Sequence, residues 1–80
     1  MQKSISSRHY AQFLATLREA REKAGISQEE LATRLGETQS FVSKCERGER
    51  RMDIVELREF CKVLGLTLEA FVKQFERGLR

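Results

Sequence analysis

Five polar residues near the middle of the chain have types and spacing suited to hydrogen bonding with a large polar partner. They are Gln39, Ser40, Ser43, Lys44 and Arg47. This spacing places them on one side of an α-helix over residues 38–47. The face carries amides, hydroxyls and two cations, whereas an ordinary solvated helix face more often interleaves Glu with Lys. We therefore interpret this segment as a helix that enters the major groove of DNA.

Catalysis is not indicated by the sequence. We find no phosphate-binding loop, metal-ligand set or nucleophile paired with a base, so we expect no enzyme activity, metal or cofactor. His9 lies near the start of the first predicted helix and is interpreted as a surface residue. Cys45 and Cys61 lack the CxxC spacing, so we favour two small buried hydrophobes. The alternative for these cysteines is a redox switch.

The composition indicates one small helical domain. The chain has 80 residues and no proline, the strongest breaker of helices. We expect a single all-α domain over residues 1–80, with residues 1–6 as a flexible tail. The net charge of +3 arises in residues 1–25, because the remainder is balanced; it permits a polyanionic partner and is also an ordinary solubility charge. With no signal peptide or membrane-spanning run, we expect a cytoplasmic protein without a membrane partner.

The helix before the central segment is predicted over residues 7–24, with Ser6 or Ser7 as its cap. Its apolar stripe consists of Tyr10, Phe13, Leu14 and Leu17. The next position of that stripe is Arg21. Its side chain either has an acidic partner inside the domain or lies along the core with its charged head in water.

Residues 28–48 form two short amphipathic segments hinged at Gly36, where a positive φ permits a sharp turn. Ser27 and Glu30 have capping-box spacing, and Thr38 can cap the second segment. The apolar positions are Leu31, Ala32 and Leu35 in the first segment and Phe41, Val42 and Cys45 in the second.

Two further helices are predicted after residue 52. A second capping box, Asp53 with Glu56, starts a helix whose stripe is Ile54, Leu57, Phe60 or Cys61, and Leu64; Gly65 ends it. Thr67 caps the last helix. Its apolar stripe consists of Leu68, Phe71, Val72, Phe75 and Leu79.

The segment ISQEELATRLGETQSFVSKCERGER resembles the lambda-repressor/Cro-like, or XRE, helix-turn-helix family. The resemblance continues through LREFCKVLGLTLEAF and spans about residues 14–75. It implies a compact five-helix domain with the helix-turn-helix at its second and third helices, which binds operator DNA as a dimer on an inverted repeat.

The resemblance also implies roles for individual residues. Gln28 is expected to contact a phosphate, and Gln39, Ser40 and Lys44 to read bases. Ser43 reaches either a base or a phosphate, and Phe41 is either core or a contact to a thymine methyl. Arg47 and Arg50 are expected to hold the DNA backbone. Arg21 and Glu46 occupy places that form an ion pair in the family.

Two functions remain open at this stage. The first is a transcriptional repressor that binds a palindromic operator as a homodimer. The candidate dimer surface is the exposed part of Leu68, Phe71, Val72, Phe75 and Leu79. That stripe could instead only close the core of the monomer. The second is an antitoxin-like module that binds a protein partner, with DNA binding secondary.

Overall fold

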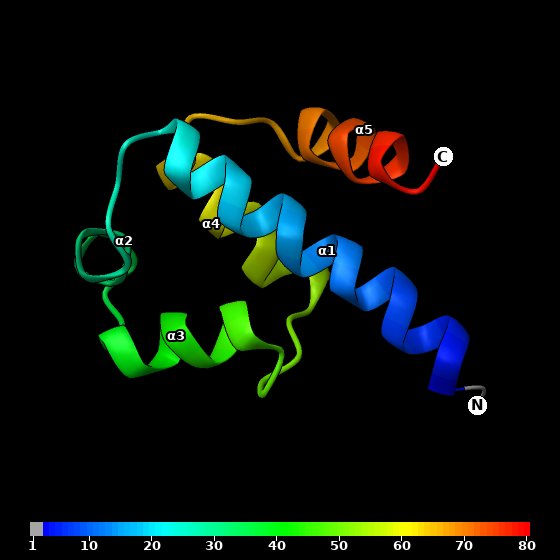
Figure 1. The fold of residues 1–80 in the computed structure, drawn as a ribbon. Helices are drawn as coiled ribbons and strands as arrows, with labels where there is room; N and C mark the ends of the chain where they lie inside the picture. The colour runs from blue at the N-terminus through cyan, green and yellow to red at the C-terminus, as the bar shows by residue number, and fades with distance from the viewer. Residues whose placement is uncertain (1–2) are drawn as a thin grey trace.

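The computed structural model describes residues 3–80, and it describes side chains from residue 8 onward. Five α-helices make up this part of the chain (Figure 1): α1 Lys3–Lys23, α2 Gln28–Leu35, α3 Gln39–Arg47, α4 Ile54–Leu64 and α5 Leu68–Gly78. The remaining described residues form turns and short connections without any strand. The predicted all-α fold with five helices is therefore confirmed. None of the described helices is long and apolar enough to cross a membrane.

The first helix is longer than the sequence suggested. It begins at Lys3, so Ser6 and Ser7 lie inside α1 and the cap predicted there is wrong. Residues 3–6, expected in a flexible tail, form its first turn, and residues 1–2 of that expected tail lie outside the described residues. A cap is a local signal, and neither serine precedes a change of backbone conformation here.

The N-terminal caps of the other helices follow the sequence closely. Ser27, Thr38, Asp53 and Thr67 each accept a hydrogen bond from the backbone N–H three residues later. Asp53 and Glu56 form a complete capping box. At Ser27 only half of the predicted box forms, because the Glu30 carboxylate accepts a hydrogen bond from Arg34 Nε at 2.8 Å instead.

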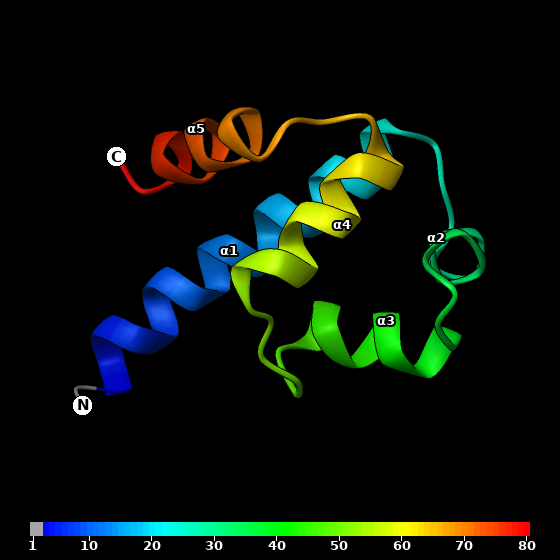
Figure 2. The same cartoon turned by 180° about the vertical axis from the view of Figure 1, so that it is seen from behind.

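The helices α3 and α5 lie on opposite sides of α1 (Figures 1 and 2), and α1 contacts both of them. The helices α2 and α3 pack against each other, and α2 also packs against α4. This arrangement leaves α3 at one edge of the molecule, with one side toward the body and the other toward solvent.

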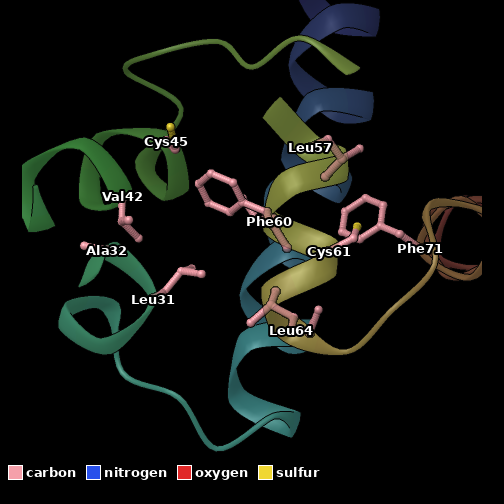
Figure 3. Packing of buried hydrophobic residues seen from close by; sticks show 11 residues of the cluster. Leu31, Ala32, Val42, Cys45, Leu57, Phe60, Cys61, Leu64 and Phe71 are labelled. Atoms are coloured by element: carbon pink, nitrogen blue, oxygen red, sulfur yellow. The ribbon is translucent and has the colours of Figure 1, made fainter. Parts of the chain in front are cut away.

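The core joins all five helices. Its buried members are Leu17, Ala20, Leu31, Ala32, Val42, Cys45, Leu57, Phe60, Cys61, Leu64 and Phe71. Figure 3 shows the Phe60 ring between α4 and the α2–α3 pair, and the Phe71 ring against α4 near Leu57 and Cys61. Both rings are 1% exposed. Phe60 therefore packs α4 against the helix-turn-helix, and Phe71 packs α4 against α5.

Ile54 is a correction to the predicted stripe of α4. It is 65% exposed, and its neighbour Val55 is 67% exposed. Ile54 is the first residue of α4, and most of its side chain faces solvent. Both Phe60 and Cys61, offered as alternatives, are buried.

Cys45 and Cys61 are free thiols, 0% and 1% exposed, and burial raises the pKa of each. Their behaviour as buried hydrophobes is thus supported by their surroundings.

We expect Gly48→Ala to unfold at a lower urea concentration than Gly25→Ala. Both glycines have positive φ, 80° and 70°, so each alanine meets backbone strain of about 1–2 kcal/mol. A Cβ at Gly48 would also lie 2.9 Å from Leu14 Cδ1, whereas a Cβ at Gly25 meets nothing within 4 Å. Equal midpoints for the two variants would show that Leu14 moves aside without cost.

Candidate nucleic-acid interface

The helix α3 has a buried back and an exposed front. Val42 and Cys45 are 0% exposed and Glu46 is 4% exposed, and these three residues face the body of the domain. On the front, Gln39, Ser40, Lys44 and Arg47 are exposed and Ser43 is half-buried. The structure therefore brings the predicted polar residues together on one solvent-facing surface, which we call the α3 front.

A hydrogen-bonded cluster behind α3 connects it to two other helices. Arg21 of α1 donates from Nε to Glu46 Oε2 at 2.6 Å and from Nη2 to Glu46 Oε1 at 3.1 Å. Gln28, the first residue of α2, donates from Nε2 to the same Oε1 at 2.9 Å. Arg21 Nη1 also donates to the carbonyl of Ile26 at 2.9 Å. The hydrogen bond to Glu46 raises the pKa of Arg21, which favours the charged guanidinium.

Gln28 thus has a partner inside the domain. Its side chain is half-buried and faces Glu46, whereas the sequence led us to expect a phosphate contact. An amide has two N–H donors and one carbonyl acceptor. The bond to Glu46 uses one donor and orients the remaining groups at the N-terminus of α2.

Arg50 also has partners within the domain. Its guanidinium forms two hydrogen bonds with the Glu56 carboxylate, at 3.1 and 2.7 Å, and lies 4.7 Å from the centre of the Phe41 ring. The bond to Glu56 raises the pKa of Arg50 and, in return, lowers the pKa of Glu56. Arg50 therefore fastens the loop after α3 to the start of α4. Only its remaining donors are free for a phosphate.

Arg47 lies between a hydroxyl and a carboxylate. Its Nε donates to Glu49 Oε2 at 2.8 Å, and its Nη1 donates to Ser43 Oγ. Both members of the ion pair are half exposed, at 54% and 55%. The hydrogen bond from Arg47 lowers the pKa of Glu49 and so favours the ionised carboxylate.

The remaining members of the α3 front have no such partner. In the part of the chain that the structure describes, Lys44 is the cation of α3 without a carboxylate within ion-pair distance. Gln39 and Ser40 follow the Thr38 cap and are exposed at the start of the helix. Phe41 is half-buried, packs against the core and has the Phe60 ring centre 6.3 Å from its own. Partial burial of Phe41 agrees with the interpretation of its spacing as core.

The apolar stripe of α5 that was predicted to form the dimer contact has one buried residue and four that are at least partly exposed. Phe71 is 1% exposed and belongs to the core, so its side chain is not part of the free surface. Leu68, Phe75 and Leu79 are half-buried, and Val72 is 43% exposed. The part of α5 that a second molecule can reach is therefore centred on Val72.

The sequence did not predict three partners: Glu49 for Arg47, Glu56 for Arg50, and Glu46 for Gln28. A signal for Glu49 was present, since Gly48 ends α3 with φ 80° and turns the chain back on itself. The N–H of Glu49 then bonds to the Lys44 carbonyl at 2.9 Å. This reversal returns the Glu49 side chain to the last turn of α3, beside Arg47.

Comparisons with known proteins agree on the fold and the family. The helix-turn-helix family model matches residues 17–71. The solved structure of an XRE-family like protein from Pseudomonas syringae pv. tomato is 47% identical, with a TM-score of 0.86 over 94% of this chain and 92% of that chain. The clp gene regulator ClgR from Corynebacterium glutamicum shares the fold, with a TM-score of 0.76 at 24% identity over 85% of this chain and 72% of that chain.

A curated relative is the uncharacterized HTH-type transcriptional regulator y4dJ from Sinorhizobium fredii. It is 36% identical over 47 residues, which cover 59% of this chain. The match spans 61%, or about three fifths, of the length of that relative.

We expect Glu46→Ala to lower the free energy of unfolding by about 3 kcal/mol, because it leaves the largely buried Arg21 guanidinium without its charge partner. The matched control is Glu30→Ala, which removes the carboxylate of the exposed Arg34 pair and is expected to cost less than about 1 kcal/mol. Urea unfolding followed by circular dichroism measures both. Similar losses in the two variants would contradict a special role for the buried pair.

Proposed function

This chain belongs to the XRE-type helix-turn-helix family of DNA-binding regulators, and we propose that its α3 front enters the major groove of double-stranded DNA. The observation that carries this proposal is the division of α3 into a fully buried back and an exposed polar front. A major groove about 12 Å wide admits one α-helix. A helix held by its back at the edge of the domain can approach the groove without unfolding.

Three residues of the α3 front are proposed to read bases. Gln39 and Ser40 lie at the start of α3, the end of a recognition helix that contacts base edges in this class of domain. Glutamine can bond adenine N6 and N7 together, and Lys44 can donate to guanine O6 and N7. Lys44 suits this role because its charge is not neutralised within the domain.

Contacts to the DNA backbone are proposed for Gln28 and Arg50, through the donors that their internal bonds leave free. Gln28 lies at the N-terminus of α2, where unpaired backbone N–H groups and the helix dipole favour an anion. Such contacts fix the register of the domain on DNA without reading sequence. Their internal bonds keep both side chains in place before DNA arrives.

A second copy of the chain completes the proposed regulator. One short helix reads only a few base pairs, whereas a genome offers a very large number of competing sites. Two copies on an inverted repeat about one helical turn apart supply the required specificity. We propose that the protein acts in the cytoplasm as a homodimeric repressor that occupies a palindromic operator.

A second candidate function is favoured by three exposed apolar side chains. Ile54, Val55 and Val72 are 65%, 67% and 43% exposed, and they lie on α4 and α5 rather than on the α3 front. Exposed apolar side chains gathered together mark surfaces for protein partners. If the three side chains form one such surface, the domain is an antitoxin-like module that binds another protein, with DNA binding secondary.

We expect selection from a random duplex pool to enrich a palindrome that wild-type protein binds and that Gln39→Ala and Lys44→Ala no longer prefer. Loss of a base contact costs about 1–3 kcal/mol, or roughly a 5- to 150-fold weaker dissociation constant. Lys73→Ala, an exposed lysine of α5, is the control and should select the same palindrome. No enrichment by the wild-type protein would contradict the regulator and favour the protein-interaction module.

We expect sedimentation at tens of micromolar to show a dimer, at least in the presence of the inverted-repeat duplex. Val72→Asp should shift this species toward monomer, because it places a charge in the exposed part of the α5 stripe. Ile54→Asp changes an exposed aliphatic residue of α4 and serves as the matched control. A wild-type protein that stays monomeric with and without DNA would contradict the homodimer.

A further inference from the structure

We propose that Arg47 reads a guanine in the major groove and that Glu49 is the positioning residue that holds its guanidinium for this contact. The inference rests on the proposed function, since it requires the α3 front to lie in the groove. It replaces the backbone contact that the sequence led us to expect for Arg47.

The head of Arg47 lies over the middle of the α3 front rather than at the end of the helix. Its Nη1 donates to Ser43 Oγ, four residues earlier in the chain. One turn of helix is about 5.4 Å, so the side chain carries the guanidinium back toward the residues proposed as base readers. Ser40 lies three residues before Ser43 and four residues before Lys44, so it neighbours both of them on the helix surface. A contact with the phosphate backbone alone does not require the guanidinium to lie beside these residues of the α3 front.

Glu49 is held rigidly where it meets Arg47. Its N–H donates to the Lys44 carbonyl at 2.9 Å, and the preceding N–H of Gly48 donates to the Cys45 carbonyl at 3.2 Å. A Cβ at Gly48 would lie 2.9 Å from Leu14 Cδ1, so the loop is packed closely onto α1 at this point. The Glu49 carboxylate therefore approaches Arg47 from a backbone that the fold has already fixed.

The hydrogen bonds that Arg47 makes within the domain leave one edge of its guanidinium free to bond a guanine. A guanidinium has five N–H donors, of which Glu49 takes the one on Nε and Ser43 takes one on Nη1. Three N–H groups remain on Nη1 and Nη2. Two donors side by side match the two acceptors of guanine, O6 and N7, which form the commonest specific contact of arginine with DNA.

Electrostatics favour a base over a phosphate as the partner of this ion pair. A phosphate would compete with Glu49 for the same guanidinium and would bring a second anion close to the carboxylate. The guanine edge is neutral, so Arg47 can bond it while keeping Glu49. The hydrogen bond from Arg47 lowers the pKa of Glu49, so the pairing favours the ionised carboxylate. The pair is thus compatible with a base contact, and it gains less from a phosphate than an unpaired arginine would.

The test measures how much binding depends on guanine N7. A palindrome enriched by the wild-type protein is prepared with 7-deazaguanine, which lacks N7, at one guanine position of each half-site in turn. Inosine at the same position keeps O6 and N7 and is the control duplex. For the wild-type protein we expect 7-deazaguanine at one position to raise the dissociation constant about fivefold or more, with inosine neutral.

Two variants of Arg47 distinguish a guanine contact from a phosphate contact. Arg47→Lys keeps the charge but loses the planar pair of donors, so the ratio of the dissociation constants for the 7-deazaguanine and guanine duplexes should fall at that position. The dependence of binding on salt should change little. The proposal is overturned if Arg47→Lys keeps the wild-type ratio at every guanine. It is also overturned if Arg47→Ala weakens all duplexes alike and reduces the salt slope by about one, as loss of one phosphate contact would.

Glu49→Gln tests the positioning role with Arg47 intact. Removal of a negative charge should strengthen binding to unrelated duplexes, while the ratio at the Arg47-dependent position should fall toward one. The matched control is Glu59→Gln, which removes the carboxylate of the exposed Lys62 pair on α4 and should keep the wild-type ratio. An unchanged ratio in Glu49→Gln would overturn the role of Glu49. Thermal unfolding should be nearly the same for all these variants, because exposed ion pairs contribute little stability.

The outcomes separate this inference from the proposed function. If the wild-type protein enriches no duplex, the proposed function fails and the inference fails with it. If it enriches a palindrome in which no guanine depends on Arg47, the proposed function holds and only the guanine contact is wrong.

Discussion

The Glu46 carboxylate is the group on which the geometry of the domain depends. It is 4% exposed and accepts three hydrogen bonds, two from Arg21 of α1 and one from Gln28 of α2. A buried carboxylate is too costly to keep unless charged and hydrogen-bonded partners compensate it. Any rotation of α3 about its axis would move Glu46 away from both partners. The buried charge therefore selects one orientation of α3, which apolar packing alone would select less sharply.

This constraint is important because α3 is short. Its nine residues are too few to form a stable helix in isolation, so its shape depends on packing and on its ends. Thr38 caps its start, and Gly48 ends it in the left-handed conformation. Arg50 then ties the following loop to Glu56 and covers the Phe41 ring. All these interactions use the back and the ends of α3, so folding makes few demands on the residues of its front.

The sequence predicted what depends on local chemistry and periodicity. The four later helices begin at the predicted caps, and the apolar spacing identified most of the buried residues. Prediction failed where the burial of a side chain or the start of a helix depends on more than the sequence pattern of that helix. Ile54 fits the α4 stripe, yet its side chain is left largely exposed. The helix α1 continues to Lys3 although serines that could cap it lie later.

At the candidate site, residue types were easier to predict than residue partners. The polar character of the α3 front followed from the spacing of Gln39, Ser40 and Lys44. The partners of Gln28, Arg47 and Arg50 did not, because each is a carboxylate brought close by a turn or by tertiary packing. Balanced charge in residues 26–51 already indicated that acids and bases lie in the same region. Only the fold shows which of them are paired.

These ion pairs within the domain change which interactions can supply affinity for DNA. Non-specific binding to DNA is dominated by cations that neutralise phosphates and release counterions. Here Arg21, Arg34, Arg47 and Arg50 each bond a carboxylate of the same domain, so fewer free cations face a DNA backbone. An ion pair can still donate to a neutral base edge, but it gains little from a phosphate. A domain built in this way has less general affinity for DNA, and in the proposed regulator a second copy on the same operator supplies the affinity that is missing.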